Sequence, residues 1–263
     1  MRGLVGAFIG SLMCFGANAF AFDQSHKLWA DVLTQFVVSE GPSTLVRYQA
    51  LLKDRSHLDA YVKEVSSVNL KDYNSWNEPT RLAFLFNAYN ALTVQFIVDG
   101  LANKPGLKSI KDLGGVFSSP WKKQFFNFLG ESSNLDHIEQ DLARPKFDEP
   151  RMHMAFNCAS LGCPALSTKP FLGETLDAQL EQAAIQFLQD PRKNNFESKK
   201  KELHLSSIFK WYGEDFENSK KFGPLNTFIA KRISAEESDR KLISAGQVTV
   251  DFKDYDWNLN IKK

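Results

Sequence analysis

The feature that most constrains the fold is an uncharged, largely apolar run over residues 82–98. A helix that is apolar on nearly every side is buried in a core or crosses a membrane. The 17 residues of this run approach the length of a membrane span, but Asn87, Asn90 and Gln95 would be costly in lipid. We therefore predict that the run forms the buried central helix of a soluble domain, with Pro79 in its first turn.

The amides of this helix need partners. Asn87 and Asn90 lie three residues apart, so they share one face of the helix. A buried amide without a hydrogen-bond partner costs about 1–3 kcal/mol. Buried amides commonly bond to backbone groups, and we expect these two to bond to a loop. The alternative is that they line or brace a functional site.

Helices are predicted first along the chain, and strands and helices mix later. Helical spacing dominates residues 22–67, with a break at Gly41-Pro42 and Ser43 as the cap of the next helix. We find neither a repeat nor a dividing linker. The predicted class is therefore α+β: a predominantly helical single globular domain over residues 22–263 with a small antiparallel sheet. Later helices are predicted at 135–143, 176–188, 207–212 and 225–233, and strands at 123–129, 196, 203–205 and 248–252.

The first 21 residues have the pattern of a secretory signal peptide. Arg2 supplies a positive charge, residues 3–16 are uncharged and largely apolar, and Ala19-Phe20-Ala21 fits the small-x-small cleavage pattern. We expect cleavage after Ala21, export to the periplasm or the medium, and no membrane span in the mature chain. An uncleaved anchor is the alternative.

Charge and composition narrow the class of partner. Hydrophobic residues make up 43% of the chain and charged residues 24%, as in ordinary globular proteins. The net charge of +1 gives no attraction to nucleic acid or to an anionic membrane surface. We expect no nucleic-acid partner, no cofactor and no bound metal, and a ligand that is a small molecule or a peptide.

The segment richest in reactive side chains is 151–164. In its first half, every second residue is Met152, Met154, Phe156 or Cys158, and this alternation predicts a strand. A loop that contains Gly162 and Pro164 follows. Such a strand would deliver His153, Cys158 and Cys163 to one loop. The segment is either a reactive site or a turn closed by a disulfide.

Several stretches of the chain resemble the domain-of-unknown-function 547 (DUF547) family. The resemblance spans residues 80–260, and a departure is Leu85, where many relatives carry a tryptophan or a similar ring. It implies that these stretches assemble one site or one core, and that the two cysteines belong to a recurring pattern. No established activity comes with it. The stretches are 81–93, 135–139 with Arg144, 150–164, 209–212 with 215–216, and 255–260.

Thiol catalysis is the first hypothesis for the site. A cysteine nucleophile needs a base or a cationic neighbour to form a thiolate near neutral pH, and His153 can serve. Cys163 is the stronger nucleophile candidate because it follows a glycine at a turn whose amides could stabilise an anion. The set of candidate catalytic residues is Cys163, His153, Cys158, Asn157, Asn87 and Asn90. The reaction would be a hydrolysis or an acyl transfer.

Three alternatives stay open. Cys158 and Cys163 could form a structural disulfide in a non-catalytic binding or assembly module, since disulfides persist in exported proteins. His153 with the two cysteines could bind a metal, although closed zinc sites usually need four ligands. Acid–base chemistry is also open, but carboxylates are too frequent for spacing to single any out. The candidates for it are Asp136, Glu139 and Asp215.

Overall fold

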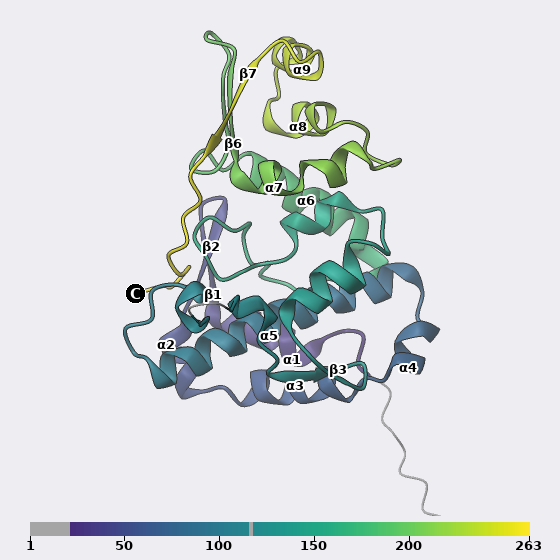
Figure 1. Cartoon of the computed structure of the whole chain (residues 1–263), viewed down its shortest axis with the longest axis vertical. Helices are drawn as coiled ribbons and strands as arrows, with labels where there is room; N and C mark the ends of the chain where they lie inside the picture. Colours follow the sequence, from purple (N-terminus) through teal and green to yellow (C-terminus); the bar gives the residue numbers. More distant parts are fainter. Residues whose placement is uncertain (1–21, 116–117) are drawn as a thin grey trace, which may run out of the picture.

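The computed structural model describes residues 22–115 and 118–263 (Figure 1). The predicted signal peptide, residues 1–21, lies outside them. Two hydrophobic clusters organise this part of the chain. The larger is built mainly from residues 29–180, and the smaller from Met154 and residues 184–243. In Figure 1 the helices α1–α5, which lie within residues 27–103, occupy the lower part of the molecule. The helices α6–α9 and strands β6 and β7, which lie within residues 176–253, are above them.

The central helix α5, Glu78–Asn103, is confirmed. Pro79 lies in its first turn, and the Asn77 side chain caps it by accepting from the backbone N–H of Thr80. Its length and composition would allow it to cross a membrane, but 89% of its most apolar window is buried inside the fold. We interpret α5 as a core helix. The helices before it are α1 Lys27–Phe36, α2 Tyr48–Lys53, α3 Ser56–Ser67 and α4 Leu70–Ser75.

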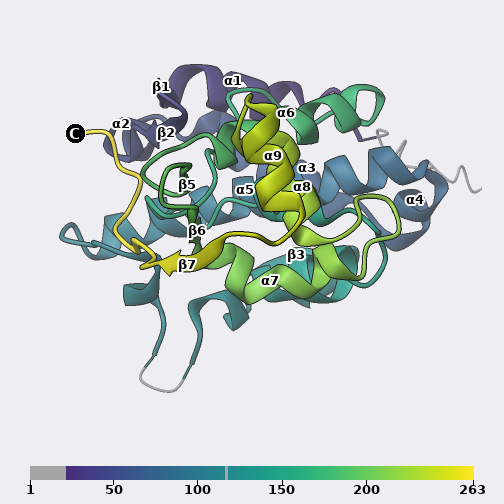
Figure 2. The same ribbon diagram turned by 90° about the horizontal axis from the view of Figure 1, so that it is seen from above.

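The α+β class with predominantly helical content is also confirmed. The described strands form three small sheets. These are β1–β2, β3–β4 and β5–β6–β7, and all pairs are antiparallel except β6–β7. Seen from above, α8 and α9 lie over the middle of the molecule (Figure 2). The bounds are β3 Phe126–Phe128, β4 Glu131–Ser133, α6 Leu176–Leu188, β5 Asn195–Glu197, β6 Glu202–Ser206, α7 Ser207–Glu217, α8 Leu225–Ile233, α9 Glu237–Ser244 and β7 Thr249–Lys253.

Two local predictions are wrong. Ser43 does not cap a helix, because β1 Val37–Glu40 and β2 Ser43–Val46 form a hairpin around Gly41, whose φ is +60°. The predicted strand at 152–158 is instead the 3-10 turn η4, Pro150–Met154, followed by a loop. Residues 151–157 are all buried, so the alternation of apolar residues does not mark one buried face.

The segment after β7, residues 254–263, returns from the smaller cluster to the larger one; we refer to it as the closing tail (Figure 1). The backbone N–H groups of Leu161 and Gly162 donate to tail carbonyls, each at 2.8 Å. Farther along, Ile261 forms a parallel bridge with Val46 in β2. The tail therefore lies against the loop that carries both cysteines and ends against the first hairpin.

Candidate functional site

A cavity of about 280 Å³ lies where elements of the two clusters meet. Its volume is near the lower end of the roughly 300–1,000 Å³ that is typical of small-molecule sites. Aromatic side chains dominate its wall, and titratable groups reach into it from several elements. The lining includes His153, Glu139, Asp136, Gln140, Cys158, Cys163, Tyr89, Trp121, Tyr212, Trp211, Tyr255 and Trp257.

His153 reaches the cavity from η4 and forms a pair with Asp215 of α7. Its Nε2 lies 2.7 Å from Asp215 Oδ2. Arg144 donates two hydrogen bonds of 2.8 Å to the same carboxylate. The imidazole also stacks on Tyr212, with ring centroids 4.0 Å apart. This arrangement fixes the ring in the manner of the carboxylate–histidine pairs of general-base sites.

Burial and charge set the protonation of this pair. Burial opposes ionisation of Asp215, but the hydrogen bonds from His153 and Arg144 outweigh it and hold the pKa of Asp215 well below its ordinary range. Burial lowers the pKa of His153, and the bond to Asp215 offsets only part of that effect. The lowered pKa favours the neutral form of His153, and because an ionised carboxylate only accepts hydrogen bonds, the proton of that form lies on Nε2. Among the described residues Nδ1 has no hydrogen-bond partner, and its lone pair is free to accept a proton.

Glu139 is the second titratable group in the cavity. It lies in η3, His137–Ala143, a helical segment with π-type hydrogen bonds, a form often found at functional sites. Asn134 precedes this segment, and its side chain accepts a hydrogen bond from the backbone N–H of His137. Burial raises the pKa of Glu139 to about 7, and hydrogen bonds with Tyr212 and Tyr89 offset part of the rise. Close to neutral pH the Glu139 carboxyl therefore exists in both protonation states.

None of the three asparagines predicted for the site lines the cavity, and each bonds to backbone groups instead. Asn90 donates to the Ala155 carbonyl at 2.9 Å and accepts from the Asn157 N–H at 2.8 Å. Asn157 in turn donates to the Pro164 carbonyl at 2.8 Å. Asn87 makes the same pair of bonds to Phe171, farther along the chain. The expected bonding of both helix amides to a loop is confirmed, and Asn90 braces the loop between His153 and Cys158.

Cys158 and Cys163 form a disulfide, as the structural alternative expects. Both cysteines line the cavity. The Tyr255 hydroxyl lies 3.1 Å from Cys163 Sγ and 3.2 Å from Cys158 Sγ. The buried Lys193 donates to the Cys163 carbonyl, which fixes the loop from its other side. In this form neither sulfur is a thiol, and neither is free to join His153 as a metal ligand.

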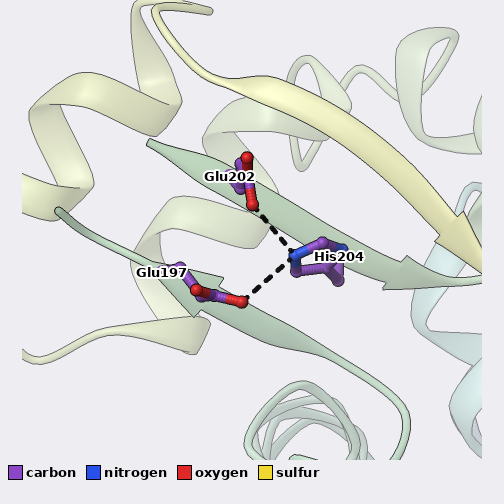
Figure 3. Close-up of side chains that lie close together, drawn as sticks. All are labelled: Glu197, Glu202 and His204. Atoms are coloured by element: carbon purple, nitrogen blue, oxygen red, sulfur yellow. Dashed lines mark ion pairs between the residues drawn. The ribbon is translucent and has the colours of Figure 1, made fainter. Parts of the chain in front are cut away.

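A separate group of metal-binding side chains lies on the β5–β6 hairpin (Figure 3). His204 Nε2 is 3.5 Å from Glu197 and 3.7 Å from Glu202. Lys200 lies 2.7 Å from Glu197 and already neutralises it, and Asp251 approaches the other ring nitrogen of His204 at 3.6 Å. We interpret the group as cross-strand ion pairing on the surface of the hairpin.

Sequence reasoning found part of this site. It singled out His153, Cys158 and Cys163 by residue type, and the structure brings all three to one cavity. It named Glu139 and Asp215, together with Asp136, as candidates for acid–base chemistry, but no spacing favoured them over other carboxylates. Tyr212, Trp211, Tyr255 and Trp257 had been given no role. The one sequence feature that could have pointed to these residues is their position inside the stretches that resemble the DUF547 family.

A comparison with known protein families finds a match that includes some of these stretches. Residues 73–188 match the model of the family described as "Protein of unknown function, DUF547". No curated protein and no solved structure matches the sequence. The matched range contains Glu139, His153 and both bridged cysteines, whereas α7 and the closing tail lie outside it. The resemblance to the DUF547 family is thus supported over residues 73–188 of the chain.

Proposed function

We propose that the cavity is the active site of a hydrolase in which His153 is the general base and Glu139 the general acid. One observation carries the proposal: the two groups face one cavity, and the surroundings of each favour its neutral form. A neutral imidazole accepts a proton, and a neutral carboxyl donates one. Pairs of groups with such opposite roles are typical of acid–base catalysts that work near neutral pH.

The reaction follows from the positions of the protons. Nε2 of His153 is held by Asp215, so Nδ1 accepts a proton from water while the water oxygen attacks the electrophilic carbon of the substrate. Glu139 gives its proton to the leaving group as the bond to that carbon breaks. Water then carries the proton from the imidazolium to the Glu139 carboxylate. The sum is one water consumed and one bond hydrolysed.

The role of Asp215 is to orient and not to take the proton. Its carboxylate is shared between His153 and Arg144, and the two guanidinium bonds fix the plane of the carboxylate. The ion pair with Arg144 also keeps Asp215 from drawing the proton off His153. Asp215 therefore acts as a positioning residue.

The test is a panel of chromogenic esters, amides and glycosides. We expect one class to be hydrolysed, with the rate falling about 10²–10⁴-fold in both His153→Asn and Glu139→Gln. The matched controls are His57→Asn and Glu131→Gln, at exposed positions outside the cavity. Hydrolysis that survives in both site variants would refute the proposal, and so would the absence of hydrolysis across the panel.

The pH profile gives an independent check. Activity requires neutral His153 and protonated Glu139. It should therefore rise as pH increases through the lowered pKa of His153, and fall as pH passes the Glu139 pKa of about 7. The expected optimum is mildly acidic. A profile that keeps rising above pH 8 would contradict the role of Glu139 as an acid.

A thiol-dependent hydrolase or acyltransferase is the second candidate. Its support is that Cys163, Cys158 and His153 share the cavity, so reduction would place a thiol beside the imidazole. It predicts activity only with a reductant, and loss of that activity in Cys163→Ser. The acid–base proposal predicts activity with the disulfide intact.

We also propose that the protein works outside the cytoplasm. The signal-like N-terminal sequence supports export, and so does the disulfide, because such bonds persist in oxidising compartments. Fractionation of the native cells would test it. Recovery of the full-length chain in the cytosol with free thiols would overturn it.

A further inference from the structure

Three aromatic side chains, Trp211, Tyr255 and Trp257, form one side of the cavity; we refer to them as the aromatic wall. Their rings pack against each other with centroids 4.5–5.9 Å apart. Trp211 is 47% exposed, so a large apolar face of its indole ring is in contact with water next to the titratable groups. One face of Trp257 is covered by the Lys111 amine, 3.7 Å from the ring centroid, so Trp211 offers the free surface.

The charge of the lining restricts what can lie against this wall. The described lining includes two carboxylates, Asp136 and Glu139, and no lysine or arginine. Burial raises the pKa of both, and the charges of Lys122 near Asp136 and of Arg144 near Glu139 offset only part of that rise. Phosphate- or carboxylate-bearing ligands would be repelled. The amide oxygen of Gln140 already accepts a hydrogen bond from Arg144, so what this side chain offers a ligand is its N–H groups.

We propose that the substrate is a neutral glycoside whose sugar ring packs on Trp211. The proposal rests on the acid–base function proposed above and names its substrate class. A sugar ring has an apolar face, which suits the exposed indole, and hydroxyls around its edge. Those hydroxyls can donate to Asp136 and pair with Gln140, and a neutral ligand lets Glu139 keep its proton. A cationic ligand would stabilise the Glu139 carboxylate and remove the acid.

The step balances as a glycoside hydrolysis. Glu139 protonates the glycosidic oxygen as the bond between that oxygen and the anomeric carbon breaks. Protonation of the leaving oxygen by a carboxylic acid of raised pKa is the usual first requirement of such enzymes. Water deprotonated by His153 supplies the new hydroxyl at the anomeric carbon. The products are two hydroxyl-bearing fragments, and no other reactant is consumed.

Binding is measured on the Glu139→Gln variant, in which turnover is suppressed. Quenching of tryptophan fluorescence and calorimetry follow the addition of chitotetraose or maltotetraose as neutral saccharides, with choline as the cation and citrate as the anion. We expect saccharide binding that weakens about tenfold or more when Trp211→Ala is added. The matched control is Phe252→Ala, which removes an exposed aromatic ring outside the cavity and should leave affinity unchanged.

The outcomes separate the two proposals. Choline binding without saccharide binding, no saccharide binding at millimolar concentration, or equal affinity in Trp211→Ala would each overturn the substrate class. Hydrolysis of esters alone, dependent on His153 and Glu139, would also overturn it while sparing the acid–base mechanism. Saccharide binding that depends on Trp211, without hydrolysis of any glycoside by the wild type, would support the ligand class and refute the proposed function.

Discussion

Replacing Asn90 by alanine tests whether the central helix holds the site loop in place. The variant removes two hydrogen bonds, one to the Ala155 carbonyl and one from the Asn157 N–H. Both backbone groups would then be buried without a partner. An unsatisfied buried group costs about 1–3 kcal/mol, so the two together set an upper range of about 2–6 kcal/mol.

The net loss should be smaller than this upper range. Alanine no longer buries an amide, and water entering the space can satisfy part of the freed backbone. We therefore expect the free energy of unfolding to fall by about 2–4 kcal/mol. That is a large fraction of the roughly 5–15 kcal/mol that stabilises a typical domain. Urea denaturation followed by far-UV circular dichroism measures it.

The chain provides a matched control one turn earlier on the same helix. Asn87 is buried to the same degree and makes two equivalent bonds, both to Phe171. Asn87→Ala should lose similar stability. Only Asn90→Ala should also shift the NMR signals of His153 and of the indole of Trp211, because only Asn90 holds the 155–157 backbone. A loss below about 1 kcal/mol for Asn90→Ala, or an equal effect of both variants on His153, would refute the reasoning.

Two further predictions concern stability. Folding raises the Glu139 pKa from 4.5 to about 7, so between these pH values the folded state binds more protons than the unfolded state. The free energy of unfolding should therefore fall by roughly 3 kcal/mol as Glu139 loses its proton between pH 4.5 and 7. Glu139→Gln should flatten that part of the urea-derived stability profile, and an unchanged slope would contradict the assignment. The Cys158→Ser/Cys163→Ser double variant should lose about 2 kcal/mol because it opens a short loop in the unfolded chain. Thermal unfolding with and without reductant checks this: the variant should match the reduced wild type, and a variant as stable as the oxidised wild type would exclude a stabilising role.

Secondary structure followed from the sequence wherever one local signal dominated. The uncharged run predicted the buried helix α5, and the helix predicted at 225–233 is α8. The β1–β2 hairpin was missed because Val37 and Val38 continue the apolar spacing of α1, and only the pairing with β2 turns them into a strand. The η4 segment was predicted wrongly because it is buried on all sides. Its sequence therefore does not alternate between buried apolar and exposed polar residues in a way that marks its true secondary structure.

The site was harder to predict for a related reason. His153 and the cysteines stood out as rare residue types, but Asp215 lies 62 residues from its partner along the chain. The acidity of Glu139 depends on burial and on Tyr89 and Tyr212, which come from separate helices. Neither property is local in sequence, so neither has a local pattern.

The closing tail has a consequence for how the protein reaches its native state. Its contacts join Val46 to Ile261 and Ser160 to Leu259, so they close some of the longest loops available to this chain. Contacts between residues far apart in the sequence form late in folding. The chain must lose the conformational entropy of closing the loop before the contact contributes favourable energy. The helices around α5 can therefore form early, while Tyr255 and Trp257 reach the cavity last. In a partly folded chain, Glu139 and His153 are in reach of water and of other molecules before the aromatic wall closes beside them.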